Sequence, residues 1–465
     1  MNDDRDAKVP PADCPVDANA QPPHRLDAPA GADANVAARR RFLKAGLAGG
    51  AALGGSVVAN AAQASGGALG GSPAAVPDPE QGKRPFYGAH QGGIGDPQQK
   101  FSYVAAFDLT TTARADVIAL LQGWTLAAAR LTQGLTAKPL SLADDQTADS
   151  TTPPDSGEAL GLGANELTIT FGFGPGLFEK DGKDRYGLAA RRPAALVDLP
   201  RFNGDQLLPA KTGGDLLIQA CANDPQVAFH AVRALSRIAY GHAQMRWGQA
   251  GFLSGPRGAT PRNLMGFKDG TSNPSIRSPE QMNRYVWADD SDADWMNGGA
   301  YTVVRRIRIT IEHWDQMERG FQEQVFGREK YSGAPLGKQH EFDDIDLNQA
   351  DKDGNPLIPE SAHIRLSHES QNNGAQILRR SYSYNDSTDF YIERWPPWRQ
   401  ETEFDAGLIF IAHQRDPRKG FIPINEKLSK FDMLNQFATH VGSGIFACPP
   451  GAREGSYIGA SLFEA

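Results

Sequence analysis

The sequence predicts an α+β protein made of two ferredoxin-like domains with antiparallel sheets, arranged as in dimeric α+β barrels. Two observations support this fold class. Stretches with the alternation of β-strands and stretches with helical spacing follow one another in the order β-α-β-β-α-β, and the second half of the chain repeats this order. Each such unit covers one face of its sheet with helices, so the other face needs a partner sheet or a ligand.

The first repeat lies between Phe101 and Phe252. Thr112 is expected to cap its first helix, with Asp116 in the first turn, because hydroxyl and acidic residues satisfy free backbone N–H groups there. Strands are expected where β-branched and aromatic residues gather between turn residues. The expected strands are 101–109, 167–171, 215–220 and 242–252, and the expected helices are 112–131 and 227–240.

The second repeat contains a long insertion. The expected strands are 301–311, 382–384, 408–413 and 441–448, and the expected helices are 314–326 and 425–437. Residues 327–380 separate the first helix of this repeat from its second strand and show little periodicity. Long segments of this kind inside a compact domain are usually functional.

The N-terminal residues 1–64 have the features of an export signal. Arg39-Arg40-Arg41-Phe42-Leu43-Lys44 precedes a Gly/Ala-rich apolar run that ends in Ala-x-Ala sites, as in a secretory signal. The paired arginines are typical of the twin-arginine signal, whose pathway exports folded proteins to the periplasm. The alternative is a membrane anchor, but the run lacks the roughly 20 strongly apolar residues that a span needs. We therefore expect no stable membrane anchor.

The remaining chain divides into three parts. Residues 65–84 are a flexible linker, 85–255 form the N-terminal domain and 256–465 form the C-terminal domain, in which we expect the functional site. The net charge of −8 argues against nucleic acid as a partner. Cys221 and Cys448 either form one disulfide or remain two buried free thiols, and Cys14 lies in the exported leader.

Three residues suggest a redox site. Asp269 lies in a glycine-flanked loop, which taken alone is also compatible with an ordinary surface turn. His363 lies in the long insertion, followed by Arg379. Haem iron needs only one strong protein ligand, usually a histidine. Peroxide reduction on haem then needs an acid/base for the proton and a cation for the developing charge, and Asp269 and Arg379 fit these needs.

The order of several short motifs makes the interpretation specific. The chain resembles the dye-decolourising peroxidase family, and within it the twin-arginine-exported deferrochelatase/peroxidase branch. The motifs that carry the resemblance span roughly residues 84–465 and are the stretches 86–94, 171–178, 266–274 with its G-x-x-D-G pattern, 305–308, 312–314, 326–328, 333–337, 363–365, 379–380 and 407–410.

The resemblance implies a role for each candidate residue. One haem b per chain is expected, with His363 as its proximal iron ligand, Asp269 as the distal acid/base and Arg379 as the distal arginine. Asp405 is expected to accept a hydrogen bond from the other ring nitrogen of His363. The residues expected along the haem edge are Gly270, Thr271 and Ser272.

The sequence departs from the family pattern at three places. Ser367-His368-Glu369-Ser370 stands where the branch has Asn-Pro-Arg, and the spacing from His363 to Arg379 is about two residues short. Ser381 replaces the usual glycine after the two arginines and offers an additional distal hydroxyl. His368 therefore remains an alternative to His363 as the iron ligand.

The expected function is a haem-dependent peroxidase that reduces hydrogen peroxide and oxidises dyes, phenolic compounds or porphyrins. The same resemblance implies a link to iron uptake with a permease system, a homo-oligomer and better activity in acid than at neutral pH. The alternative is a deferrochelatase, which releases iron from haem and leaves the porphyrin ring intact. A non-catalytic haem carrier is a third interpretation, although a carrier needs neither Asp269 nor Arg379.

Overall fold

The computed structural model describes residues 82–140, 152–253, 255–256, 258–387 and 404–464, and the backbone of 393–395 and 398–400. The predicted export signal 1–64, Cys14 and most of the predicted linker 65–84 lie outside the described residues. Among the helices of the described part of the chain, none has the length and apolar character needed to cross a bilayer.

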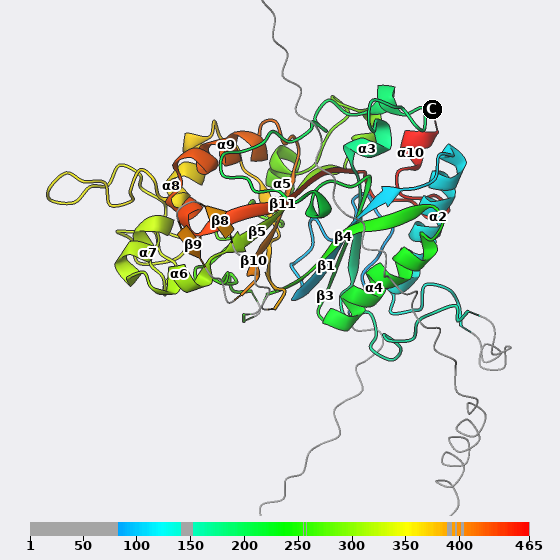
Figure 1. Ribbon diagram of the computed structural model, residues 1–465, viewed down its shortest axis with the longest axis horizontal. Coiled ribbons are helices and arrows are strands. Elements are labelled where there is room, and N and C mark those ends of the chain that lie inside the picture. The colour runs from blue at the N-terminus through cyan, green and yellow to red at the C-terminus, as the bar shows by residue number, and fades with distance from the viewer. Residues whose placement is uncertain are drawn as a thin grey trace, which may run out of the picture. The chain divides into compact units, whose positions relative to one another are not determined.

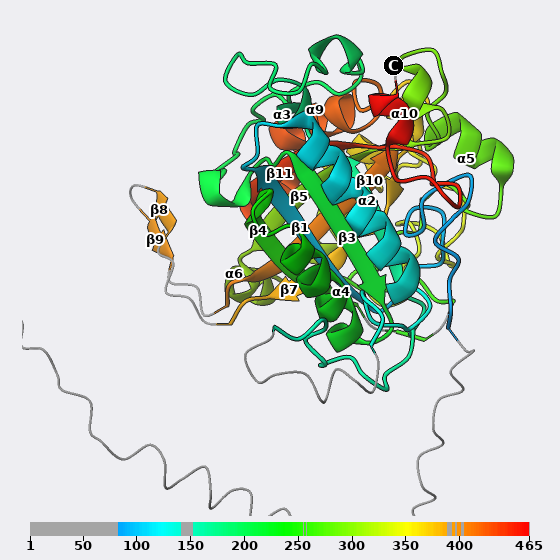
Figure 2. The same cartoon turned by 90° about the vertical axis from the view of Figure 1, so that its right-hand side faces the viewer.

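The N-terminal unit is a four-stranded antiparallel sheet with two long helices on one face. Its sheet order is β2-β3-β1-β4, which is the ferredoxin-like arrangement. Helices α2 and α4 lie side by side across the outer face of this sheet (Figure 2). The elements are β1 (Phe101–Leu109), α2 (Arg114–Leu131), β2 (Thr168–Phe173), α3 (Pro175–Phe178), β3 (Leu216–Ala222), α4 (Pro225–Ile238) and β4 (Ala243–Phe252).

The C-terminal unit repeats the order as β11-β5-β10-β7. Its strands are β5 (Ala300–Ile309), β6 (Leu378–Arg379), β7 (Tyr382–Asn385), β8 (Glu393–Trp395), β9 (Trp398–Gln400), β10 (Ala406–Gln414) and β11 (Ala438–Cys448). Its helices are α5 (Pro279–Tyr285), α6 (Ile311–Asp315), α7 (Arg319–Phe326), α8 (His363–Ser367), α9 (Phe421–Phe431) and α10 (Ala460–Phe463). Figure 1 shows α6, α7, α8 and α9 gathered at the end of the molecule away from α2 and α4.

The two sheets join into one barrel. Strand β4 pairs with β7 at Phe252 and Ser383, and β11 pairs with β2 at Ala447 and Phe173. The β5–β10 pairing completes the ring. The predicted fold class, two ferredoxin-like units forming an α+β barrel, is confirmed.

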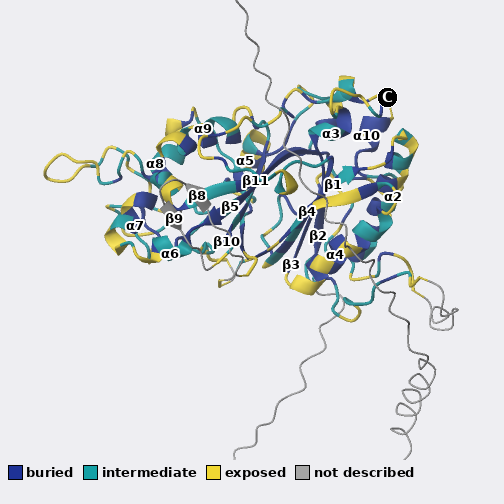
Figure 3. Cartoon of the chain, in the orientation of Figure 1, coloured by how far each residue is buried: buried dark blue, intermediate teal, exposed yellow. Residues whose placement is uncertain are grey.

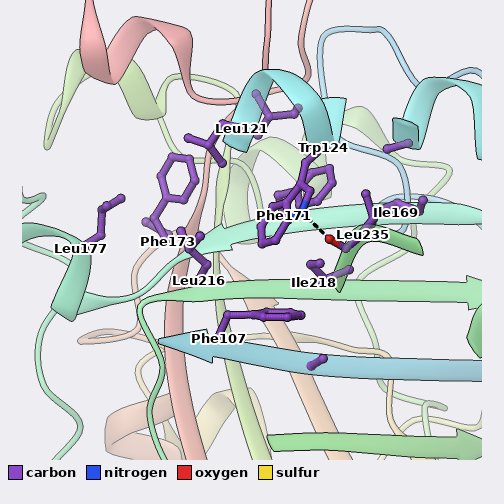
Figure 4. Close-up of a cluster of buried hydrophobic side chains, with 14 of the residues drawn as sticks. Phe107, Leu121, Trp124, Ile169, Phe171, Phe173, Leu177, Leu216, Ile218 and Leu235 are labelled. Carbon is purple, nitrogen blue, oxygen red and sulfur yellow. Dashed lines mark hydrogen bonds between the residues drawn. The ribbon is translucent and has the colours of Figure 1, made fainter. Parts of the chain in front are cut away.

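The N-terminal core lies between the sheet and its two helices. Trp124 of α2 stacks on Phe171 of β2 with ring centroids 5.5 Å apart, and its indole N–H donates to the carbonyl of Leu235 at 2.9 Å (Figure 4). A buried indole needs such a partner because an unpaired N–H in an apolar core is costly. Figure 3 shows buried residues along the strands and the inner faces of the helices.

Three predicted helices have different boundaries in the structure, because capping residues or an interruption of the helix set their ends. Thr112 is not the N-cap of α2: the cap position is Ala113, and the Thr111 hydroxyl accepts from the Ala113 N–H at 3.1 Å and donates to Asp116 at 2.6 Å. The predicted helix 314–326 is divided into α6 and α7. The predicted helix 425–437 begins earlier and stops at Phe431, where Asp432 caps the 3₁₀ turn Met433–Gln436.

Cys221 and Cys448 are both buried free thiols, so the disulfide alternative is wrong. Burial raises the pKa of the Cys448 thiol to about 12, against the opposing hydrogen bond from Thr302. Since the thiolate is the reactive form, this cysteine is structural rather than reactive at neutral pH.

Candidate active site

A cavity of about 840 Å³ opens in the C-terminal unit. Ligand pockets typically have volumes of roughly 300–1,000 Å³ and largely apolar walls. Strands β5 and β10 supply Ile307, Ile309, Leu408 and Phe410 to its wall. Further wall residues come from the segment 202–206, from the loop 263–273, from α9 and the residues after it, and from the long insertion. The insertion therefore helps to build the pocket, as its length predicts.

His363 begins α8 in the insertion and lines this cavity. Its Nδ1 lies 2.6 Å from Oδ2 of Asp432, whose side chain is only 3% exposed. A carboxylate accepts hydrogen bonds, so Nδ1 carries a proton, and in the neutral ring this leaves the lone pair on Nε2. No partner of Nε2 is found among the described residues. In many metal sites, a carboxylate holds the ring of a histidine through one nitrogen while the other nitrogen coordinates the metal. The His363–Asp432 pair has this arrangement.

The predicted partner of His363, Asp405, is wrong. Asp405 lies directly before β10 and accepts a hydrogen bond from Arg306 at 2.9 Å, with Arg308 at 3.7 Å. These two arginines of β5 neutralise it, and it is not part of the cavity wall. The carboxylate that contacts the His363 ring is Asp432, which the sequence did not indicate because it lies inside the helix predicted for residues 425–437.

Asp269 and Arg379 form an ion pair in the same cavity. The Arg379 guanidinium donates to Oδ1 of Asp269 at 2.9 Å, and the side chains are 24% and 19% exposed. Asn273 holds Arg379 in place: its Oδ1 accepts from the Arg379 backbone N–H at 3.2 Å and its amide donates to the Arg379 carbonyl at 2.7 Å. The acid and the cation are therefore positioned together, as peroxide chemistry requires.

The loop around Asp269 depends on its glycines. Gly266 and Gly270 have φ angles of +86° and +114°, in the region that side chains rarely adopt. The Asp269 backbone N–H donates to the Pro261 carbonyl at 2.9 Å, which fixes the carboxylate-bearing residue between them. The loop lines the cavity, so the surface-turn alternative does not describe it.

Arg328 is a further cation in the cavity wall, beside Arg379 and Lys268, to which the sequence analysis assigned no role. It donates to the Gly333 carbonyl at 2.7 Å and contacts the Ser272 hydroxyl at 3.4 Å. Burial lowers the pKa of Arg328 to about 10, the charge of Arg379 adds to this, and Glu341 opposes it. Arg328 thus remains charged at neutral pH. The motif Phe326-Gly327-Arg328 carries part of the family resemblance without indicating a role for its arginine.

The residues predicted for the haem edge, Gly270, Thr271 and Ser272, all line the cavity. The Thr271 hydroxyl donates to Glu341 at 2.9 Å, and Lys268 forms an ion pair with the same carboxylate. Burial raises the pKa of Glu341, but the hydrogen bonds from Lys268, Thr260 and Thr271 outweigh it and hold this pKa below its usual range. Glu341 therefore fastens the Asp269 loop to the insertion.

Replacing Glu341 by glutamine is expected to lower the free energy of unfolding by about 1–3 kcal/mol, since the hydrogen bonds from Lys268, Thr260 and Thr271 lose their charged acceptor. Urea unfolding of wild type and variant measures the difference. Glu360→Gln, at an exposed position of the same insertion, is the matched control and should change little. Equal losses in the two variants would contradict the fastening role.

His368, the alternative iron ligand, also lines the cavity. Its Nδ1 contacts the hydroxyl of Ser370 at 2.8 Å and accepts from the Ser370 backbone N–H at 3.2 Å. With its Nδ1 held by a local turn and no carboxylate on its ring among the described contacts, it lacks the arrangement found at His363. The geometry favours His363.

Comparison with known proteins identifies the chain. A family model for the N-terminal part of Dyp-type peroxidases matches residues 91–253, and one for the C-terminal part matches residues 260–453. The chain belongs to the DyP-type peroxidase family. The Dye-decolorizing peroxidase of Thermobifida fusca (strain YX) is 38% identical over 450 residues, covering 92% of this chain and 97% of the relative. The Deferrochelatase of Escherichia coli (strain K12) is 36% identical over 443 residues, covering 92% and 98%.

Solved structures agree. Ferric DtpA from Streptomyces lividans is 38% identical, with a TM-score of 0.73 over 84% of this chain and 100% of that chain. A dye-decolorizing peroxidase of Bacteroides thetaiotaomicron shares only the fold, at 17% identity and a TM-score of 0.53. This DyP-type peroxidase is therefore an oxidoreductase that acts on peroxide with an electron donor. Its cavity fits a haem because it combines the volume, the apolar walls and a carboxylate-held histidine.

Proposed function

We propose that this peroxidase binds one haem b in the 840 Å³ cavity, with His363 as its proximal ligand, and uses it to reduce hydrogen peroxide while oxidising small organic donors. One observation carries the proposal: the His363–Asp432 pair and the Asp269–Arg379 pair line the same cavity. The first pair suits metal coordination, and the second suits proton transfer and charge stabilisation. Dyes, phenolic compounds or porphyrins are the proposed donors.

The chain's own residues divide the work. A bound haem supplies the redox-active iron at which peroxide is reduced. Asp432 keeps His363 in one tautomer and makes it a stronger electron donor. Asp269 removes a proton from one peroxide oxygen and delivers it to the other as the O–O bond breaks. Arg379 stabilises the negative charge that develops on the departing oxygen.

The reduction of one hydrogen peroxide to two molecules of water consumes two electrons and two protons. The electrons come from two one-electron donors, such as phenols. Ile307, Ile309, Leu408 and Phe410 of β5 and β10 give the cavity an apolar wall against which a haem ring would pack.

A loading and turnover assay tests this function. The purified protein is incubated with haem, freed of excess and mixed with hydrogen peroxide and a phenolic donor or dye. We expect donor oxidation that requires both haem and peroxide. Haem-dependent oxidation that is no faster than with free haem would contradict the proposal.

Asp432→Asn is expected to retain the fold but to weaken haem affinity or peroxide turnover about 10–100-fold, the usual effect of removing a carboxylate behind a metal-bound histidine. The iron–histidine stretching frequency of the ferrous protein should also fall, since the ring loses its anionic partner. Asp405→Asn is the matched control, because Asp405 contacts arginines outside the cavity. An Asp432 variant indistinguishable from wild type would contradict the role of this pair.

The second candidate function is deferrochelatase activity, which the names of relatives at 35–36% identity favour. It uses the same haem pocket, so the products distinguish the two functions. Metal-free porphyrin, detected by its fluorescence, together with an iron chelate indicates iron release. Oxidised donor with the haem left intact indicates peroxidase activity alone. The non-catalytic carrier is the weakest candidate, since it gives no use to the Asp269–Arg379 pair.

We further propose that the chain is exported folded to the periplasm, forms a homo-oligomer and works beside an iron-uptake permease. Arg39-Arg40 and the apolar run that follows support export through the twin-arginine pathway. Replacing both arginines by lysine and following the protein in periplasmic fractions tests the route. Unchanged periplasmic yield would contradict it.

A further inference from the structure

A second, much smaller cavity also borders the Asp269–Arg379 pair, since both residues line it as well as the large cavity. Its volume is about 20 Å³. Ser381 and Gln98 border the small cavity but not the large one. The hydroxyl expected from the sequence to face the haem therefore borders the space next to the acid/base pair instead.

The Ser381 hydroxyl has an unmet hydrogen-bonding capacity. Its oxygen is buried, and no hydrogen-bond partner is found among the described residues. The Gln98 amide donates to the Ser381 backbone carbonyl at 2.8 Å, which fixes the serine at the cavity edge. A buried hydroxyl without a partner destabilises a protein, so such groups usually bind ordered water.

The small cavity has the size and polarity for one water molecule. A water needs about 10–15 Å³ of accessible space and two to four polar partners. Ser381 provides a hydroxyl, Asp269 a carboxylate and Gln98 an amide, and Asn263 also borders the space. Arg379 occupies Oδ1 of Asp269, and no partner of Oδ2 is found among the described contacts.

We propose that Ser381 holds a water molecule against Asp269 and that this water exchanges protons with the carboxylate during turnover. The proposal rests on the proposed peroxidase function and adds a positioning residue to it. Ser381 touches neither haem nor peroxide in this scheme and acts through the water.

The proton balance shows why such a water is useful. Asp269 moves a proton between the two peroxide oxygens, but forming two waters consumes two further protons per turnover. The two electrons come from the organic donor, and the protons come from solvent or from that donor. A water beside Asp269 gives the carboxylate a proton-exchange partner in the small cavity, next to the cavity where peroxide would bind.

The direct test is a high-resolution crystal structure of the wild type, followed by Ser381→Ala. We expect an ordered water within hydrogen-bonding distance of Ser381 and Asp269 in the wild type, and its loss or displacement in the variant. This readout is independent of haem and of activity. A wild-type structure in which the small cavity holds no water would overturn the proposal.

The kinetic test compares Ser381→Ala, Ser381→Gly and the hydroxyl-retaining Ser381→Thr. Haem content should be unchanged in all three, whereas peroxide reduction should fall about 10-fold in the first two, less than for loss of the acid/base itself. In the alanine and glycine variants, the solvent deuterium isotope effect on peroxide reduction should rise. Ser381→Thr should restore the wild-type rate and the wild-type isotope effect. If alanine and glycine variants match wild type while Asp269→Asn is inactive, the water relay is wrong and the peroxidase function stands. If wild type itself does not reduce peroxide, the proposed function fails.

Discussion

Asp269→Asn is expected to bind haem as well as wild type but to react with hydrogen peroxide about 10²–10⁴ times more slowly. Asparagine has nearly the same shape and can still bond to Arg379, but it cannot accept and return a proton. Loss of a positioned acid/base typically costs a factor of this size. Stopped-flow absorbance at the haem band, at fixed peroxide concentrations, measures the rate.

The control is Asp343→Asn, a carboxylate that lines the same cavity without contacting Arg379 in the described structure. It should retain most of the wild-type rate. The wild-type rate of dye oxidation is also expected to fall between pH 4 and 8, in keeping with the acidic preference that the family resemblance implies. A rate that stays flat over this range, or a fast Asp269→Asn variant, argues against Asp269 as the acid/base.

His363→Ala is expected to abolish stable haem binding, the second large effect. Among the described histidines of the cavity, only His363 contacts a buried carboxylate. Its removal leaves Oδ2 of the buried Asp432 without a hydrogen-bond partner among the described contacts. Absorption spectra after incubation with haem and gel filtration measure the bound haem.

His368→Ala is the matched control, since His368 lines the same cavity but is held by Ser370. It should load haem like wild type. Because an unsupported Asp432 destabilises the fold, the unfolding midpoint of His363→Ala should be measured alongside. A folded His363→Ala protein that still shows a histidine-ligated spectrum, lost only when His368 is also replaced, would reassign the ligand.

Much of the fold could be predicted because strands and helices are indicated by local sequence patterns. The alternation from Phe101 to Leu109 marks β1 with its observed bounds, and each strand of both repeats was found within a few residues. The predictions were wrong at helix ends that are set by tertiary contacts or by capping residues. Thr112 looked like an N-cap, but Thr111 makes the contacts, and the helix predicted after Ile311 breaks between Asp315 and Arg319.

The sequence predicted which residues form the site, but it did not predict which of them contact each other. His363, Asp269 and Arg379 come from segments far apart in sequence, and the structure places all three on one cavity. The partner of His363 required knowing that the residue after α9 folds back onto α8, which no local pattern encodes. Ser381 was noticed as an unusual residue, but only the structure shows which cavity it borders.

Titration of the wild-type apoprotein with haem b, followed by absorbance and repeated with His363→Ala, tests the central claim most directly. We predict a saturating haem band at one equivalent per chain for the wild type, with a histidine-ligated iron, and no saturable binding for the variant. A wild type that binds no haem, or identical titrations for the two proteins, would contradict the account of this cavity.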